Sequence, residues 1–184
     1  MFKKIMIFLV FSVAIFASSS RISQIKTLSS QVSESTYFTG EKKTKVYNIE
    51  YVEPDYLRKE IISPTINKGE IFQYENNKRY IYIPLFDEVT EDGNVDEVNN
   101  FLSIIKDLKN KDINDENFSK NYYQKKVKKV KYKDIYEIHL LDFKKVNGIL
   151  IPIKISIYEG DVKLADLKLE DVKINNGLQR KELN

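Results

Sequence analysis

Residues 45–84 read KVYNIEYVEPDYLRKEIISPTINKGEIFQYENNKRYIYIP, and this stretch decides the fold class. It divides into four short runs in which apolar or aromatic residues alternate with polar ones, predicted as strands over 45–52, 56–63, 69–75 and 78–83. A proline follows three of the runs, and Asn76-Asn77 is a dipeptide typical of hairpin turns. The stretch therefore predicts an antiparallel meander.

The last third of the chain continues the same pattern. Three further strands are predicted over 135–143, 149–159 and 162–175. Asn147-Gly148 is the strongest hairpin-turn dipeptide in the chain, because both residues tolerate positive φ angles. The alternation of the final strand slips near Asp166 and again near Asp171, which predicts β-bulges that bend the sheet.

Two helices are predicted beside these strands. Residues 21–34 place apolar residues at near-helical spacing, and residues 95–109 do so more regularly. Asn94 and Glu97 stand at the positions of a capping box for the second helix. Residues 91–94 and 110–121 are polar and predict loops. The fold class is mainly β (α+β): a curved antiparallel sheet forming an unclosed half-barrel, with helices as a lid over its concave apolar face.

Composition excludes most familiar site chemistries. The 184 residues contain no cysteine and six scattered glycines, so thiol chemistry, cysteine metal sites and glycine-rich phosphate loops are excluded. His139 is the single histidine, and we expect it to be structural. We expect no enzyme activity, no metal and no cofactor. Without residues 1–17 the chain has 28 basic and 27 acidic residues, and four of all its basic residues are arginines, so no nucleic-acid partner is expected.

Residues 1–19 have the layout of a secretory signal peptide. Lys3 and Lys4 precede a twelve-residue apolar run that is too short to span a bilayer comfortably, and small residues follow it. Cleavage is predicted near Ala17 to Ser19, leaving 20–184 as one soluble exported domain. The alternative is an uncleaved membrane anchor.

The order of these elements resembles the LolA-like family of periplasmic outer-membrane lipoprotein carriers and sorting proteins. The resemblance is carried by Pro54, Arg58, Pro64, Asn76-Asn77, Tyr80, Tyr82 and Pro84, and by the run from Pro152 to Tyr158. In the best-known carriers an arginine directly precedes the first of these prolines and holds the lid closed. This chain has Glu53 there, so that latch is not carried over.

The resemblance implies a periplasmic monomer that carries acylated lipoproteins or lipids from an inner-membrane donor complex to an outer-membrane acceptor. Candidates for the acyl-chain lining are Tyr47, Ile49, Tyr51, Phe72, Tyr74, Tyr80, Tyr82, Phe101, Leu102 and Ile105. Arg58 is the candidate for a polar contact with the lid.

Several alternatives stay open at this stage. The lining candidates could be ordinary core, and alternation alone does not decide which strand face points inward. The lysine-rich run 125–133 is read either as a solvated strand at the edge of the sheet or as a site for anionic partners. A carrier of lipids or glycolipids, or a sensor or interaction module without transport activity, would fit the same fold.

Overall fold

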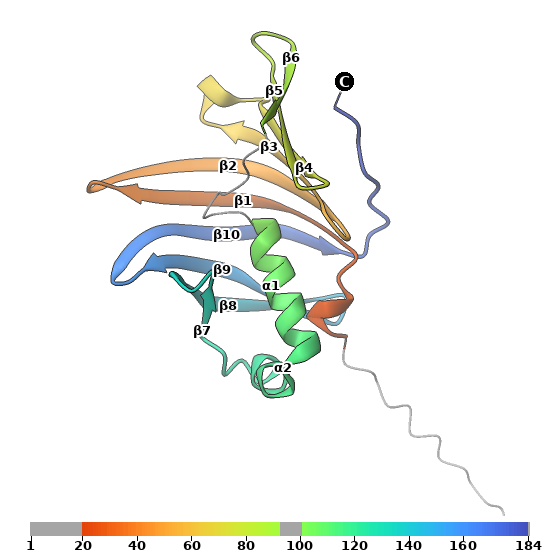
Figure 1. The fold of residues 1–184 in the computed structure, drawn as a ribbon, viewed down its shortest axis with the longest axis vertical. Coiled ribbons are helices and arrows are strands. Elements are labelled where there is room, and N and C mark those ends of the chain that lie inside the picture. The colour runs from red at the N-terminus through yellow and green to blue at the C-terminus, as the bar shows by residue number, and fades with distance from the viewer. Residues whose placement is uncertain (1–19, 93–100, 184) are drawn as a thin grey trace, which may run out of the picture.

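The computed structural model describes residues 20–92 and 101–183, without the side chains of Asp92 and Leu102 (Figure 1). Its strands are β1 (Thr27–Phe38), β2 (Glu41–Val52), β3 (Tyr56–Ser63), β4 (Ile71–Glu75), β5 (Lys78–Ile83), β6 (Glu88–Asp92), β7 (Lys129–Tyr132), β8 (Tyr136–Val146), β9 (Ile149–Glu159) and β10 (Val162–Ile174). Its helices are the 3-10 turns η1 (Ile22–Gln24) and η2 (Thr65–Asn67) and the α-helices α1 (Phe101–Asn114) and α2 (Glu116–Tyr123).

The strands form one antiparallel sheet in the order β6-β5-β4-β3-β2-β1-β10-β9-β8-β7. The first and last strands pair at its centre, so β1–β6 lie on one side and β7–β10 on the other. The edge strands β6 and β7 are not paired with each other, which leaves the half-barrel open. Figure 1 shows the sheet curving and α1 crossing one of its faces. The predicted fold class is confirmed.

Most of the predicted strands are found in place. β3, β5 and β9 have the predicted bounds, because each lies between turn-forming residues. Asn76 and Asn77 both have positive φ angles, as a tight hairpin requires. The predicted bulges are also present. The register of β10 shifts between Lys163 and Ala165, and Asp171 has a φ of 51° where the pairing with β1 shifts.

The predicted helix over 21–34 is wrong. Only η1 is helical there, and β1 begins at Thr27. Leu28 and Val32 are four residues apart, a spacing that fits one face of a helix and one face of a strand equally well. The segment forms a strand because it pairs with β2 on one side and with β10 on the other.

The predicted loop over 110–121 is wrong, and so is the described part of the predicted loop over 91–94. Residues 110–121 form the end of α1 and most of α2, which begins after Asp115, whose side chain accepts a hydrogen bond from the backbone N–H of Phe118 at 2.8 Å. Glu91 and Asp92 belong to β6 rather than to a loop. The start of the predicted helix, with Asn94 and Glu97, lies outside the described residues.

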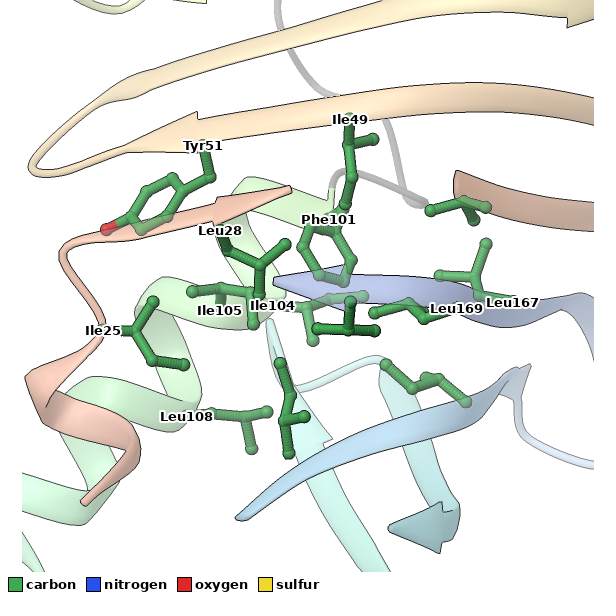
Figure 2. Packing of buried hydrophobic residues seen from close by; sticks show 14 of the residues in the cluster. Ile25, Leu28, Ile49, Tyr51, Phe101, Ile104, Ile105, Leu108, Leu167 and Leu169 are labelled. Carbon is green, nitrogen blue, oxygen red and sulfur yellow. The ribbon is translucent and has the colours of Figure 1, made fainter. Parts of the chain in front are cut away.

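The hydrophobic core lies between the sheet and α1 (Figure 2). Cross-strand pairs share one face of a sheet, so the register assigns every strand residue to a face. We call the face that carries Leu28, Ile49 and Tyr51 the inner face, because these residues pack against α1. The opposite one is the outer face. Among the described residues, no helix is long and apolar enough to cross a membrane.

Candidate functional site

The inner face gathers most of the predicted lining residues. Tyr47, Ile49 and Tyr51 of β2 are each at most 2% exposed, and Figure 2 shows Ile49 pointing toward Phe101 of α1. The predicted lining residues found in the core or packed against it are Tyr47, Ile49, Tyr51, Phe72, Tyr74, Phe101 and Ile105. Aromatic and branched apolar side chains therefore cover the face beneath the helix.

Two predicted lining residues lie elsewhere. The two-residue turn at Asn76-Asn77 pairs Tyr74 with Arg79, which places Arg79 on the inner face and Tyr80 and Tyr82 on the outer face. The sequence could not show this, because β5 carries large side chains on both of its faces. Leu102 belongs to α1, but its side chain lies outside the described residues.

A charged pair lies within the apolar inner face. Lys59 Nζ is 3.5 Å from a carboxylate oxygen of Glu34, and Glu34 is 5% exposed. The same ammonium group lies 4.1 Å from the ring centroid of Tyr47 and 5.9 Å from that of Phe72. Burying two charges is costly, so the pair is held by mutual attraction and by the two aromatic rings.

Sequence analysis missed this pair, although a signal for it exists. Lys59 stands between Leu57 and Ile61 at an inward position of the alternation in β3. Glu34 was missed because residues 21–34 were predicted as a helix. In the correct strand it follows Leu28 and Val32 on the same face.

One polar contact ties α1 to the end of β2. Lys109 is 7% exposed, and its Nζ donates hydrogen bonds to the carbonyl oxygen of Ile25 and to Glu53 Oε1, both at 2.6 Å. It also lies 3.4 Å from the hydroxyl oxygen of Tyr51. Glu53 is the residue that stands where the resembled carriers have an arginine. Here the helix supplies the cation and the strand end supplies the carboxylate.

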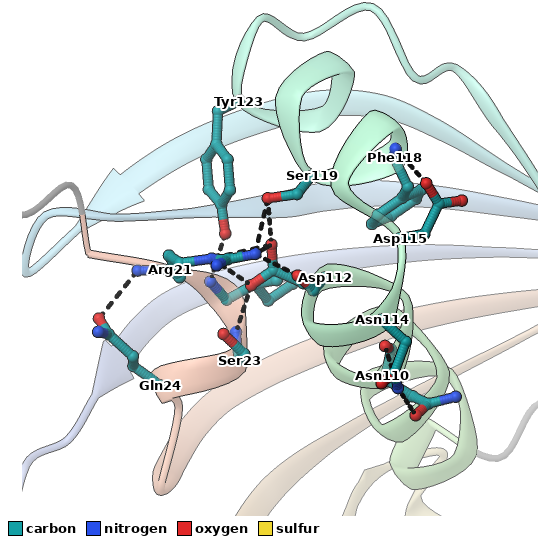
Figure 3. A network of polar contacts seen from close by, with 11 residues as sticks. Arg21, Ser23, Gln24, Asn110, Asp112, Asn114, Asp115, Phe118, Ser119 and Tyr123 are labelled. Carbon is teal, nitrogen blue, oxygen red and sulfur yellow. Dashed lines mark hydrogen bonds and ion pairs between the residues drawn. The ribbon is translucent and has the colours of Figure 1, made fainter.

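A second polar network lies three residues further along α1, at Asp112 near the C-terminal end of the helix (Figure 3). Arg21 Nη2 lies 3.0 Å from Asp112 Oδ1, and Ser119 Oγ donates to the same oxygen at 2.8 Å. The backbone N–H of Ile22 donates to the hydroxyl oxygen of Tyr123 at 2.7 Å. Burial by itself would raise the pKa of Asp112, but the hydrogen bonds from Arg21, Ser23 and Ser119 outweigh it and lower that pKa. The network joins the segment before β1 to both α-helices.

Arg58 does not reach the helices. It lies on the outer face, where its guanidinium is 2.7 Å from Glu60 and 4.0 Å from Glu50. The expected contact with the lid is therefore not made by this residue, and its guanidinium instead pairs with Glu60 on its own strand and Glu50 on the neighbouring strand.

The lysine-rich run 125–133 leads into and forms the edge strand β7. Val130 and Tyr132 point inward and are buried, whereas Lys129 and Lys131 are exposed. Lys129 Nζ lies 2.8 Å from Glu137 on β8. Residues 129–132 of the run are thus a solvated strand at the edge of the sheet, where exposed lysines discourage pairing with other strands.

The residues of a hydrolytic triad are close together but do not form one. His139, Ser156 and Asp166 are cross-strand neighbours on the outer face. Ser156 donates directly to Asp166, and His139 Nε2 lies 2.5 Å from Glu137 instead. Since Ser156 is 1% exposed, its hydroxyl is inaccessible to a substrate. The described residues contain no group of histidines and acids able to hold a metal ion.

The fold is LolA-like, as three solved structures show. A DUF1329 family protein from Desulfovibrio piger aligns over 86% of this chain and 89% of its own, with a TM-score of 0.58 and 12% identity. A putative outer membrane lipoprotein-sorting protein domain from Vibrio parahaemolyticus aligns over 83% and 87%, with a TM-score of 0.55 and 8% identity. A LolA superfamily protein from Nitrosomonas europaea aligns over 83% and 88%, with a TM-score of 0.55 and 10% identity.

These likenesses define the class of fold and nothing finer. No protein-family model matches the chain, and no curated protein matches it. At such low identity the structural neighbours carry no residue roles over to this chain, so its function has to be argued from its own inner face.

Proposed function

We propose that the protein is a periplasmic carrier that shields the acyl chains of lipoproteins between α1 and the inner face and passes them toward the outer membrane. The observation that carries the proposal is the aromatic inner face beneath α1, with the Lys59–Glu34 pair set into it. The likeness to lipoprotein-sorting folds supports the same reading.

The physical task of such a carrier is to keep apolar chains away from water and still release them. Each methylene withdrawn from water contributes about 0.8 kcal/mol, so an acyl chain needs a large apolar surface. Tyr47, Tyr51, Tyr74 and Phe72 offer such a surface on the inner face. Helix α1 is tied to the rest of the chain by the contacts of Lys109 and Asp112, and exchange of these contacts for water would let it move aside. Transfer of this kind needs no bond chemistry, which agrees with a protein that is not an enzyme.

The proposal also assigns the location and the partners. Residues 1–19 would direct export and be removed, leaving 20–184 as a single periplasmic domain. The protein would act as a monomer between an inner-membrane donor complex and an outer-membrane acceptor. Amino-terminal sequencing and the native mass of the protein recovered from the periplasm test the cleavage and the monomeric state.

The first experiment is mass spectrometry of lipids and acylated proteins that copurify with the protein from its own periplasm. Triacylated lipoproteins would support the proposal. The matched variants are Phe72→Ser on the inner face and Tyr80→Ser on the outer face, which lie on adjacent paired strands and are both partly buried. We expect Phe72→Ser to reduce the bound acyl material and Tyr80→Ser to leave it unchanged.

Two other functions would use the same fold. Recovery of phospholipid or glycolipid without lipoprotein would indicate a lipid carrier. A sensor or interaction module is favoured by one observation, because Ile49, Tyr51 and Phe101 are almost fully buried within the hydrophobic core. No bound lipid from the periplasm, and no binding of a fluorescent fatty acid by the pure protein, would contradict the carrier and leave that module.

A further inference from the structure

The exposed large apolar residues gather at one end of the strands. Of the nine such residues in the described part of the chain, six lie in or directly beside hairpin connections: Phe38, Ile66, Leu85, Phe86, Ile135 and Val162. Their exposed fractions run from 60% for Ile135 to 89% for Ile66. Scattered exposed apolar residues are ordinary, but their concentration in turns is not.

The antiparallel topology places these turns at the same end. The connections β1–β2, β3–β4, β5–β6, β7–β8 and β9–β10 all lie where β1 ends and β10 begins, because Thr36 pairs with Ala165. We call this end the apolar rim. The connections at the other end consist of 53–55, 76–77 and 147–148, and they contain Glu, Pro, Asp, Asn and Gly without a large apolar residue. The two ends of the sheet therefore differ in chemistry.

Two of the connections in the apolar rim lie against each other. A Cβ atom at Gly69 would lie 3.1 Å from the Pro84 ring, so the β3–β4 and β5–β6 connections are in close contact. The backbone N–H of Phe86 donates to the carbonyl oxygen of Ile83 at 3.1 Å, which closes the turn that presents Leu85 and Phe86. Figure 1 shows the β1–β2 connection at the left edge of the molecule, the β3–β4 connection above it and the β5–β6 connection at the top.

We propose that the apolar rim inserts into the surface of a lipid bilayer. Side chains on the tips of separate turns suit a bilayer, which accepts them at any spacing, whereas a protein partner needs a continuous complementary surface. The five connections carry Lys68 and Lys133 against Glu70, Asp87, Asp134 and Asp161, so the rim has no excess of positive charge. Binding is therefore driven by apolar insertion and does not need anionic lipid. The inference deepens the proposed function by naming where the carrier meets a membrane.

The chain has no tryptophan, so a single introduced one reports on its own position. Phe86→Trp places the reporter on the rim, and Ile113→Trp places it on α1 at an equally exposed site, 65% against 64%. Both are made in residues 20–184, which hold every helix and strand of the described fold, so the apolar segment 1–19 cannot insert. The probe is a suspension of pure phosphatidylcholine vesicles.

We expect a blue shift of emission for Phe86→Trp and none for Ile113→Trp. The double variant Leu85→Ser with Phe86→Ser should bind vesicles about a hundredfold more weakly, since each of the two apolar residues removed is worth roughly tenfold. A shift at neither site, a shift at both, or binding that requires anionic lipid and disappears in salt would each overturn the proposal.

The same experiment keeps the two proposals apart. Binding of a fluorescent fatty acid without vesicles tests the carrier function, and we expect it to be unchanged in the Leu85→Ser, Phe86→Ser variant. Fatty-acid binding without insertion would overturn the rim proposal alone. Insertion without fatty-acid binding would contradict the carrier alone.

Discussion

Lys109 Nζ of α1 lies 2.6 Å from Glu53 Oε1 at the end of β2, and the same ammonium group donates to the carbonyl oxygen of Ile25 at 2.6 Å. One buried cation thus joins the helix, the β2–β3 connection and the segment that leads into β1. Relative to the resembled carriers, the sign of the charge at position 53 is reversed, and the matching charge comes from the helix. The contact lies in the C-terminal half of α1.

Replacing Lys109 with Met should loosen α1 while keeping its apolar stem. Hydrogen bonds to a charged group contribute about 1.5–3 kcal/mol, so we expect a loss of about 2 kcal/mol in the free energy of unfolding. Urea denaturation measures that loss, and hydrogen exchange should show faster exchange in α1. The matched control is Lys106→Met, an exposed lysine of the same helix. Equal effects of the two variants would contradict this role for Lys109.

The polar network around Asp112 predicts that the folded protein loses stability in acid. The pKa of Asp112 is lowered in the folded protein, from an ordinary value of 3.8. A lowered carboxyl pKa contributes stability above its unfolded value, and that stability is lost as the pH falls through the folded pKa. We therefore expect Asp112→Asn to be less stable near neutral pH, and its stability to fall less steeply below about pH 4. Denaturation at a series of pH values measures both.

Asp107, on the same helix, should behave in the opposite way. Burial raises its pKa above the ordinary 3.8, more than the attraction of Lys111 lowers it. Its ionised form is thus disfavoured in the folded state, so Asp107→Asn should be as stable as the native protein or more stable near neutral pH. If both asparagine variants lost stability to the same degree, hydrogen bonding rather than charge would explain the effect.

The Glu34–Lys59 pair should show strong energetic coupling. Lys59→Met leaves a carboxylate on the inner face without its cation, and breaking a buried pair costs about 3–5 kcal/mol. The double variant Glu34→Gln with Lys59→Met should recover most of this loss, because neither charge then remains buried alone. Urea denaturation of the two single variants and the double variant completes the cycle. Strictly additive losses would contradict the coupling.

At the Asp171 bulge, glycine should leave the stability of the fold unchanged, whereas a β-branched residue should lower it. Its φ of 51° lies in the left-handed region, where a Cβ atom is costly. Asp171→Val should therefore destabilise the fold by about 1–2 kcal/mol, whereas Asp171→Gly should be nearly neutral. The control is Lys173→Val, an exposed position on the same strand. Thermal unfolding of the three variants distinguishes a backbone effect from loss of surface charge.

Local sequence determined where the chain turns. Asn76-Asn77, Asn147-Gly148 and the slip near Asp171 fix backbone angles that few other residues adopt, so the hairpins and one bulge were predictable from a handful of positions. Strands β5 and β9, which each begin directly after such a turn, were then predicted with their correct bounds. These features depend on interactions within a few residues, which a sequence displays directly.

The tertiary structure decided what depends on distant partners. Leu28 and Val32 fit a helix or a strand until β2 and β10 pair on either side of β1. Tyr80 and Tyr82 fit the inner face until the register with β4 turns them outward. The Glu34–Lys59 pair, the attachment of Lys109 to Glu53 and the common end of the apolar turns all join residues far apart in the chain. The sequence by itself therefore determined the fold class and its turns, whereas pairing and register, which are long-range, determined the composition of the candidate site.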